Sequence, residues 1–413
     1  MKIGLLHFSG PPMIGGVEQT MYYQAKQLAL ADHEPIFIVG EGEAVFPESQ
    51  VIRIPQLFSR HPEVLAAKAE LDAGHTGPHY QELLQVLSSL LHEITTAMDV
   101  LLVHNALTLH KNLALTQALW DLYQAGDLPP LIGWHHDFAW SRPDYHAELH
   151  DGLPWELLKK PWPGTMHVVV SKAQQQKLAS LYGIDPDQIT VIPPGVDPAI
   201  TGQWTELTQQ LVSELRLLEA AVLLLLPARI TRRKNIELAI QIHAEFCQQT
   251  EKDIRLIVSG PPGPHNPTNI AYLERLLQLA QDLGFQKKVH FLYQLGPTPP
   301  LSIDDDTMAN LYGLCDALLF PSSDEGFGIP ILEAGLVRMP IFCSDLSPFK
   351  ESGRGQIHIF DLSEPPQEIA RRISDTIFKD NAYILRERVR REFTWQHIVR
   401  DKLIPMCERL LHD

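Results

Sequence analysis

Short apolar runs alternate along this chain with longer amphipathic segments, a pattern typical of a parallel β-sheet covered by helices on both faces. The runs of the first half predict strands at Ile3–Phe8, Pro35–Val39, Val51–Ile54, Val100–His104, Leu131–Trp134, His167–Val170 and Thr190–Ile192. Those of the second half predict strands at Val222–Pro227, Arg255–Ser259, Val289–Leu292, Ala317–Phe320, Pro340–Cys343 and Ile357–Phe360. The intervening segments predict helices at Gln19–Ala31, Gln81–Ala97, Ala173–Tyr182, Glu237–Gln249, Ala271–Leu283, Met308–Leu314, Pro330–Gly335 and Pro366–Lys379. The chain is therefore expected to form two doubly wound α/β domains in tandem.

The length of the chain agrees with two domains, because 413 residues exceed what one hydrophobic core of ordinary size organises. We predict a first domain at 1–192, a Pro- and Gly-rich linker at 193–204 and a second domain at 205–385. Helices at 386–413 are expected to cross back to the first domain. Ligands of open parallel sheets bind outside the carboxyl ends of the strands, so two such domains facing each other would form a cleft there. Functional residues are therefore expected in the loops that follow strands.

The chain is acidic, with 34 Lys and Arg against 50 Asp and Glu and a net charge of −16. This charge disfavours nucleic acid and anionic lipid as partners, so we expect no nucleic-acid complex and no stable membrane association. Any anionic ligand must then meet a local basic cluster. The four cysteines form no CxxC pair, and no run reaches the roughly 18–20 apolar residues of a membrane span. The N-terminus also lacks a secretory signal, and together these features predict a cytoplasmic location.

The loop at 321–335, PSSDEGFGIPILEAG, combines glycines, a proline and two acids directly after a predicted strand. Pro330 favours the first position of a helix, which places Gly328 just before a helix N-terminus, where backbone N–H groups favour an anion such as phosphate. Glu325 is then expected in the loop and Glu333 in the first helical turn. Carboxylates accept hydrogen bonds from hydroxyls, so this pair fits a phosphate attached to sugars. The alternative is that Glu333 only complements the helix dipole and that Glu325 is a solvated turn residue.

A basic cluster, PARITRRKN at 227–235, follows the first strand of the second domain. Arg229 and Lys234 are expected at the carboxyl end of that strand, where two cations would neutralise a diphosphate. Arg232 and Arg233 are expected to be solvated residues of a basic turn. The basic cluster that the acidic chain requires is thus predicted in the second domain.

Two loops of the first domain are further candidates. Gly15 and Gly16 lie between the first strand and the first helix, where their N–H groups would be free to meet a phosphate, although a Gly-Gly pair is weak evidence alone. His135, His136 and Asp137 follow the strand that ends at 134. Neighbouring side chains on a strand point to opposite faces, so only one of the two histidines is expected to face a ligand. A structural histidine or a zinc site are the alternatives, and no third metal ligand with suitable spacing is evident.

Taken in order along the chain, these motifs resemble the retaining glycosyltransferases of family GT4, which have the GT-B fold. The resemblance rests on GGVEQ, the His-Asp at 136–137, VVVSKAQQQKLASLYGIDPDQITVIPPGVD at 168–197, ARITRRKN at 228–235 and EGFGIPILE with its E-x7-E spacing. It covers nearly the whole chain. It implies two Rossmann-like domains facing across a cleft, and an enzyme that moves a hexosyl group from a UDP-, GDP- or ADP-sugar to a hydroxyl of a small-molecule or saccharide acceptor.

The resemblance also implies roles for single residues. Arg229 and Lys234 would bind the diphosphate, Glu325 the transferred sugar and Glu333 the ribose hydroxyls. His136 would bond a hydroxyl of the transferred sugar, with His135 as the fallback and Asp137 as a further sugar or acceptor contact. The other implied donor-binding residues lie on the same loops: Gly15 and Gly16 near the distal phosphate, Phe327, Gly328 and Ile329 near the sugar and phosphates, and Gly260, Tyr293 and Leu295 near the base.

The mechanism that the resemblance implies is a front-face transfer in which the leaving phosphate helps to deprotonate the acceptor hydroxyl. No cofactor or metal is then expected, because Arg229 and Lys234 take the place of a metal ion. Two alternatives stay open, a disaccharide phosphorylase using the same phosphate cradle and a non-catalytic sugar- or nucleotide-binding protein. Residues 57–80 follow no pattern of the family, so the acceptor is open as well, as are the base, the sugar and the oligomeric state.

Overall fold

The structure is a computed structural model that describes residues 1–264, 266–296 and 300–412. Its chain divides into two compact units. The first unit consists of Met1–Val196 together with the chain from Phe393 onward, and the second consists of Asp197–Glu392. The first division lies inside the predicted linker. The second lies at Phe393, whereas the sequence places the start of the returning segment at 386.

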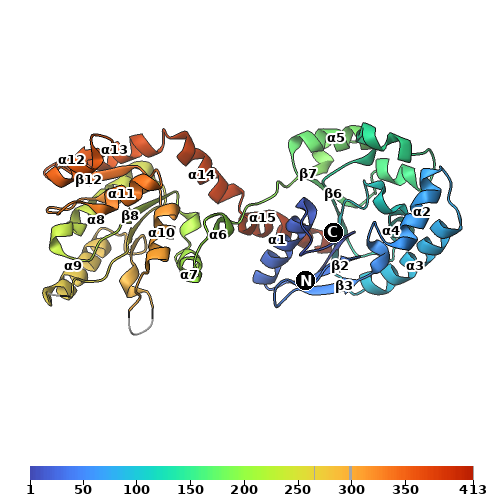
Figure 1. The fold of residues 1–413 in the computed structure, drawn as a ribbon, viewed down its shortest axis with the longest axis horizontal. Coiled ribbons are helices and arrows are strands. Elements are labelled where there is room, and N and C mark those ends of the chain that lie inside the picture. Colours follow the sequence, from blue (N-terminus) through green and yellow to red (C-terminus); the bar gives the residue numbers. More distant parts are fainter. Residues whose placement is uncertain (265, 297–299, 413) are drawn as a thin grey trace. The chain divides into compact units, whose positions relative to one another are not determined.

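The first unit is built on a parallel sheet with the order β3-β2-β1-β4-β5-β6-β7 (Figure 1). Its strands are β1 (Lys2–His7), β2 (Glu34–Val39), β3 (Gln50–Arg53), β4 (Val100–His104), β5 (Leu131–His135), β6 (Met166–Val169) and β7 (Ile189–Val191). Its helices are α1 (Gly16–Leu30), α2 (Pro62–Asp72), α3 (Pro78–Thr95), α4 (Leu113–Ala125), α5 (Lys172–Tyr182), α15 (Trp395–Ile398) and α16 (Ile404–His412). Its 3₁₀ turns include η2 (His110–Asn112), η3 (Ala139–Ser141), η4 (Pro143–Glu148) and η5 (Trp155–Lys159).

Both faces of this sheet are covered, as the apolar runs predict. Successive side chains of a strand point to opposite faces. Leu101 and Val103 of β4 accordingly join a core with α3 and α4, whereas Val100 and Leu102 join a core with α1 and the C-terminal helices. Residues 57–80, which follow no predicted pattern, form α2 and the start of α3.

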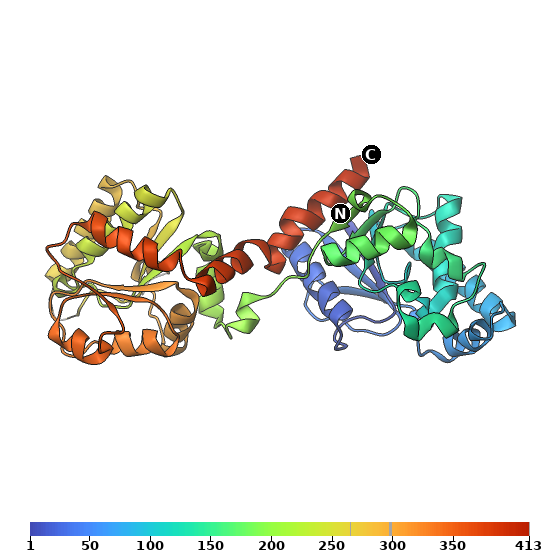
Figure 2. The ribbon, with the colours of Figure 1, turned by 90° about the horizontal axis from the view of Figure 1, so that it is seen from above.

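The C-terminal segment completes the second of these cores. The Val196 N–H donates to the Phe393 carbonyl over 2.7 Å, and the Trp395 N–H donates back to the Val196 carbonyl over 3.2 Å. The Trp395 ring stacks on the Tyr23 ring of α1 at a centroid distance of 5.5 Å. A π-helical turn at 399–403 joins α15 to α16, and this last helix is the red segment that ends at C in Figure 2. The chain thus returns to the first unit after the second is complete.

The second unit has a parallel sheet with the order β10-β9-β8-β11-β12-β13. Its strands are β8 (Val222–Leu226), β9 (Ile254–Val258), β10 (Val289–Phe291), β11 (Ala317–Phe320), β12 (Ile341–Ser344) and β13 (His358–Phe360). Its helices are α6 (Pro198–Thr201), α7 (Glu206–Glu214), α8 (Ile236–Thr250), α9 (Thr268–Asp282), α10 (Asp305–Leu314), α11 (Ile329–Leu336), α12 (Ser347–Gly353), α13 (Pro366–Ile377) and α14 (Asn381–Glu392). The predicted strands of both units are confirmed, each within one residue at either end.

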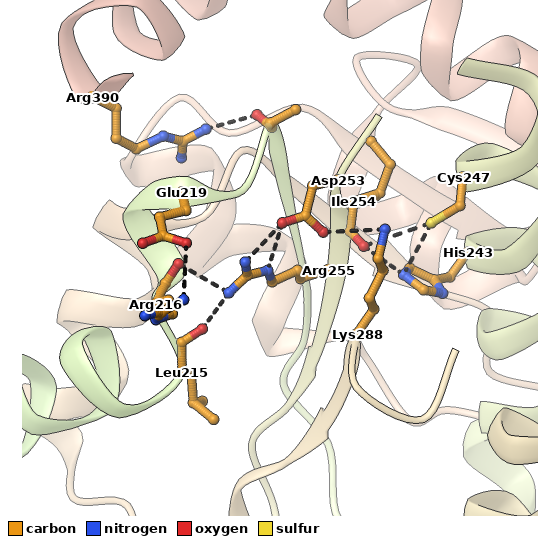
Figure 3. Close-up of polar contacts among 11 residues, drawn as sticks. Leu215, Arg216, Glu219, His243, Cys247, Asp253, Ile254, Arg255, Lys288 and Arg390 are labelled. Atoms are coloured by element: carbon orange, nitrogen blue, oxygen red, sulfur yellow. Dashed lines mark hydrogen bonds and ion pairs between the residues drawn. The ribbon is translucent and has the colours of Figure 1, made fainter. Parts of the chain in front are cut away.

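Charged side chains hold together the amino-terminal edge of the second sheet (Figure 3). Asp253, just before β9, forms ion pairs with Arg255 at 2.7 Å and Lys288 at 3.3 Å. Arg390 of α14 pairs with Asp316 at 3.1 Å and donates to the Ala221 carbonyl over 2.7 Å. Both side chains of the Arg390–Asp316 pair are almost completely buried, at 4% and 1% exposure. This edge is structural, which leaves the carboxyl edge for ligands.

Candidate functional site

The loops that follow β8 and β11, neighbouring strands of the second sheet, are bonded directly to each other. The Ser323 N–H donates to the Arg233 carbonyl over 2.7 Å, which fixes the loop after β11 against η8 (Arg232–Lys234). Lys234 forms an ion pair and hydrogen bond with Glu325, and the side chains are only 9% and 10% exposed. The Lys234 ammonium also lies 4.7 Å from the centre of the Phe320 ring. The predicted cation and the predicted acid are therefore brought together at the carboxyl edge.

Arg233 is a second cation on the same carboxylate. Its guanidinium lies 3.0 Å from Glu325 and donates to the Asp324 carbonyl over 3.0 Å. The expectation that Arg233 is only a solvated turn residue was therefore wrong, because the close approach of the two loops turns its side chain toward Glu325. Arg232, by contrast, is exposed and lies 5.5 Å from the Tyr272 ring.

Opposing effects act on the pKa values of this pair. Burial lowers the pKa of Lys234, and the hydrogen bond and charge of Glu325 oppose the change without cancelling it. Burial pushes the pKa of Glu325 upward, but Lys234 and Arg233 outweigh burial and lower that pKa. The Glu325 carboxylate is therefore held in its ionised form by two cations.

The turn before α11 depends on Gly328. Its φ of +90° is a left-handed conformation, and a Cβ on this residue would lie 2.8 Å from the Phe349 ring. The helix begins at Ile329, so Pro330 takes its second position. The prediction that Glu333 lies in the first helical turn was therefore wrong. Glu333 lies in the second turn and is exposed, and its carboxylate accepts a 2.6 Å hydrogen bond from the Tyr312 hydroxyl.

The remaining predicted residues of the second unit lie on loops at the carboxyl edge. Arg229 is exposed. Gly260 has no room for a side chain, because a Cβ would lie 2.4 Å from the Ala228 carbonyl oxygen, so its visible role is to let the loops after β8 and β9 approach. Phe327 and Ile329 are 45% and 61% exposed beside the Gly328 turn. Tyr293 and Leu295, which follow β10, are half-buried against the core of the unit.

In the first unit, the Gly-Gly loop borders a cavity of about 520 Å³. Gly15 caps α1 in an extended conformation and Gly16 is the first helical residue. A Cβ on Gly16 would meet no atom within 4 Å, so this position is open. Glu18, which the motif does not single out, accepts a 2.5 Å hydrogen bond from Ser9 and also lines the cavity.

The two consecutive histidines have different surroundings, and only His135 belongs to β5. His135 is completely buried, where one ring nitrogen lies 3.0 Å from His167 and the other 3.2 Å from the Thr108 hydroxyl. It is therefore a core residue, and the fallback assignment to His135 finds no support. His136 is half-buried, and its ring stacks on His104 with 5.7 Å between centroids. The histidine that the resemblance favours is the accessible one.

Asn105 holds the loop that carries His136, a role that the motifs do not indicate. Its side-chain oxygen accepts hydrogen bonds from the His136 N–H at 2.8 Å and the Asp137 N–H at 3.3 Å. Asn105 is buried and has a φ of +60°, a conformation that asparagine tolerates better than most residues. The signal in the sequence was an asparagine directly after a strand. Asp137 itself forms a 3.4 Å ion pair with Arg142.

Burial keeps these histidines neutral. Burial, with a smaller contribution from His7, lowers the pKa of His136 to about 4. The pKa values of His104 and His135 are lowered well below the ordinary value, again mainly by burial. At neutral pH His136 is therefore an uncharged imidazole that can donate one hydrogen bond and accept another.

Within residues 1–264, 266–296 and 300–412, no three His, Cys, Asp or Glu side chains are grouped as a metal site. Across those same residues, no helix combines the length and apolar character that crossing a membrane requires.

Two family models match successive parts of the chain, glycosyltransferase family 4 at residues 14–200 and glycosyl transferases group 1 at residues 212–391. The chain belongs to the GT4 glycosyltransferases. It is an enzyme of the transferase class with the two Rossmann-like domains of the GT-B fold, which excludes the non-catalytic binding protein.

Curated relatives match the GT4 enzyme over much of its length. Mannosylglucosylglycerate synthase of Petrotoga mobilis is 24% identical over 380 residues, which cover 85% of this chain and 84% of the relative. The protein of the same name from Thermotoga maritima is 25% identical over 423 residues, covering 91% and 92%. D-inositol 3-phosphate glycosyltransferase of Acidothermus cellulolyticus is 30% identical over 171 residues, covering 41% of this chain and 35% of the relative.

Solved structures are similar to the GT4 enzyme at lower identity. HepE of Anabaena in complex with UDP-glucose is 19% identical with a TM-score of 0.35, and the match covers 100% of this chain and 98% of HepE. Sucrose-phosphate synthase of Thermosynechococcus elongatus is 16% identical with a TM-score of 0.40, and the match covers 100% of both chains.

Proposed function

We propose that this GT4 enzyme transfers a hexosyl group, with retention of anomeric configuration, from a nucleotide-diphosphate sugar to an acceptor hydroxyl without a metal ion. The observation that carries the proposal is the cluster of Lys234, Arg233 and Glu325 on two adjacent loops at the carboxyl edge of the second sheet. Two cations that share one carboxylate leave positive charge at this edge for an anionic ligand. A diphosphate carries negative charge that would pair with these cations.

The donor is assigned to the second unit, with Lys234 and Arg229 on the diphosphate. In the free enzyme Glu325 neutralises Lys234, so the buried ammonium is never uncompensated. When the diphosphate binds Lys234 in place of Glu325, the Glu325 carboxylate can accept a hydrogen bond from a hydroxyl of the transferred sugar. Lys234 and Arg229 then stabilise the charge that develops on the leaving diphosphate.

Glu333 is assigned to the ribose of the nucleotide. Its carboxylate is exposed on the second turn of α11 and is oriented by the Tyr312 hydroxyl, which leaves further lone pairs for ribose hydroxyls. The N–H groups at Gly328 and Ile329 begin α11 and are assigned to the phosphates, with Phe327 beside the sugar. Gly260, Tyr293 and Leu295 are assigned to the base.

In the first unit, His136 is assigned to a hydroxyl of the transferred sugar and Gly16 to the distal phosphate, with Gly15 supporting the same loop. The low pKa of His136 makes it a hydrogen-bonding group and not a proton donor at neutral pH. The leaving phosphate is then the base that receives the proton of the acceptor hydroxyl. We place the enzyme in the cytoplasm, as its cysteine pattern predicts.

A panel of nucleotide sugars tests the proposal. UDP-, GDP- and ADP-linked glucose and mannose are mixed with the enzyme in the presence of EDTA, and melting temperature and slow release of nucleoside diphosphate are measured. One donor class is expected to raise the melting temperature and to be hydrolysed. NMR of the released or transferred sugar is expected to show the anomeric configuration of the donor. If no donor stabilises the enzyme or releases nucleotide, the proposal fails, and disaccharide cleavage that needs inorganic phosphate would point to a phosphorylase.

Matched variants localise the site. Glu325→Ala and Lys234→Ala are expected to lose nucleotide release while they stay folded. Arg232→Ala is the control, because Arg232 lies on the same turn but faces Tyr272. Wild-type turnover in either of the first two variants would remove that residue from the site.

A further inference from the structure

A cluster of two cations lies against the Tyr145 ring of η4 in the first unit. The Lys111 ammonium lies 4.3 Å from the centre of this ring, and the Arg142 guanidinium carbon lies 5.3 Å from it. Because both distances end at one centroid, the two cations are no more than about 10 Å apart. An aromatic face attracts a cation without neutralising it, so both charges stay available to an anion.

The cluster lies beside the residues assigned to catalysis. Lys111 is in η2, which follows β4, and Arg142 follows β5, the neighbouring strand, so both belong to the carboxyl edge of the sheet. The Arg142 guanidinium contacts the Asp137 carboxylate at 3.4 Å, and Asp137 is next to His136. Among the described residues, this single ion pair leaves other N–H groups of the Arg142 guanidinium without a partner, and its side chain is 46% exposed.

The Tyr145 ring is itself fixed by its neighbours. Buried His110 packs edge-on against Tyr145 at 4.6 Å, and its Nε2 lies 2.8 Å from the Glu148 carboxylate. Lys68 of α2 donates to the same carboxylate over 2.6 Å. The hydrogen bond from Lys68, and then that from His110, lowers the pKa of Glu148 to about 2. Glu148 is thus ionised, and one of its oxygens is shared by Lys68 and His110.

Lys111 differs from Lys68 in lacking such a partner. In the described part of the chain, no carboxylate lies within 4 Å of the Lys111 ammonium. A lysine that lies against an aromatic ring and has no acidic partner is suited to bind an anion from solution.

We propose that Lys111 and Arg142 bind an anionic substituent, a carboxylate or a phosphate, of the acceptor. The proposal rests on the function above and specifies its acceptor as an acid. Arg142 offers the paired N–H groups that match two oxygens, and Lys111 adds a point charge. The two cations lie beside Asp137 and His136. An acceptor whose hydroxyl receives the sugar near His136 could therefore place its acid group at Lys111 and Arg142.

Binding is the first test. The donor site is saturated with the nucleoside diphosphate identified above, so that further anions cannot bind there. Glycerate, glycerol 3-phosphate and glycerol, which share a carbon skeleton, are then titrated by calorimetry, and inorganic phosphate is titrated as the bare anion. One or both acids are expected to bind at least 10-fold more tightly than glycerol, and the better of the two identifies the carboxylate or the phosphate as the recognised group. Equal binding of glycerol, or no binding of any acid, would overturn the proposal.

Variants connect that binding to the two cations. Lys111→Met and Arg142→Gln are each expected to weaken binding of the acid about 10-fold. Lys159→Met is the matched control, because Lys159 lies 4.1 Å above the ring of Trp140, a different aromatic residue of the same region. If the first two variants bind the acid as the wild type does, or if the control loses as much, the site is not formed by Lys111 and Arg142.

Kinetics separate this proposal from the function on which it rests. Nucleotide release without acceptor is expected to be unchanged in Lys111→Met and Arg142→Gln, because neither residue is assigned to the donor. Stimulation of release by the acid is expected to require about 10-fold more acid in both variants. If release itself is absent in the wild type, the proposed function fails. If release occurs and no acid is preferred, only the acidic acceptor fails.

Discussion

Replacing Lys234 by Met removes one partner of a nearly buried ion pair. Breaking a fully buried pair costs about 3–5 kcal/mol, because the remaining charge is left without compensation. Arg233 stays at 3.0 Å from Glu325 and offsets part of that loss, so we expect the free energy of unfolding to fall by about 2–3 kcal/mol. For a unit of this size the melting temperature should then fall by roughly 5–10 °C. Nucleotide release should fall at least about 100-fold, since a preorganised charge on the leaving group is lost.

Arg233→Met is the comparison that makes this prediction specific. Arg233 contacts the same carboxylate, but its side chain is 50% exposed, and an exposed pair contributes only about 0–1 kcal/mol. Thermal melts and nucleotide-release rates are measured for both variants beside the wild type. Equal losses of stability in the two variants would refute the argument from burial. Wild-type nucleotide release in Lys234→Met would refute the assignment of Lys234 to the diphosphate.

Three further predictions follow from contacts away from that pair. Arg390→Met should lower the free energy of unfolding in urea by about 2–4 kcal/mol, because it leaves the buried Asp316 carboxylate with the more distant Arg386, at 3.7 Å, as its cationic partner. The surface residue Arg391 should tolerate the same change within about 1 kcal/mol. Burial lowers the pKa of His167 to about 4 in the folded chain, whereas its pKa is about 6.5 in the unfolded chain. Between these two pH values the unfolded chain binds more protons, so the free energy of unfolding should fall as the pH drops from about 6.5 toward 4. The urea midpoint should therefore decrease from pH 7 to pH 5, with a smaller decrease in His167→Gln, and a flat profile in the wild type would contradict this account. Tyr312→Phe removes the hydroxyl that orients Glu333. It should raise the KM for the nucleotide sugar roughly 5-fold at unchanged kcat, which corresponds to a loss of about 1 kcal/mol of binding free energy. An unchanged KM would contradict the assignment of Glu333 to the ribose.

The strands could be predicted from the sequence because a parallel sheet buried on both faces imposes short apolar runs, and few other structures produce them. The sequence also indicates that Lys234 and Glu325 lie at the same edge of the second sheet, because both follow strands of one parallel sheet. The sequence does not state which strands are neighbours. That β8 lies beside β11 is a property of the topology, and it is what brings the two loops together.

The misplaced details have local causes. Arg233 was assigned to solvent because a basic turn has no obvious partner along its own chain, and its partner is almost a hundred residues away in sequence. Glu333 lies in the second helical turn because the left-handed Gly328 lets the helix begin at Ile329, one residue before the proline that the sequence suggests as its first residue. Asn105 was missed because its role depends on a side-chain amide capping a different loop.

The return of the chain to the first unit has a consequence for synthesis. The stacking partner of Tyr23 is Trp395, so the core on that face of the first sheet is incomplete until the second unit has been made. At about 5–20 residues per second, the ribosome needs roughly 10–40 s to add the second unit. For that interval the nascent first unit has an uncovered apolar face, a surface of the kind that chaperones bind. The second unit, whose chain is continuous, needs no later segment to complete its core.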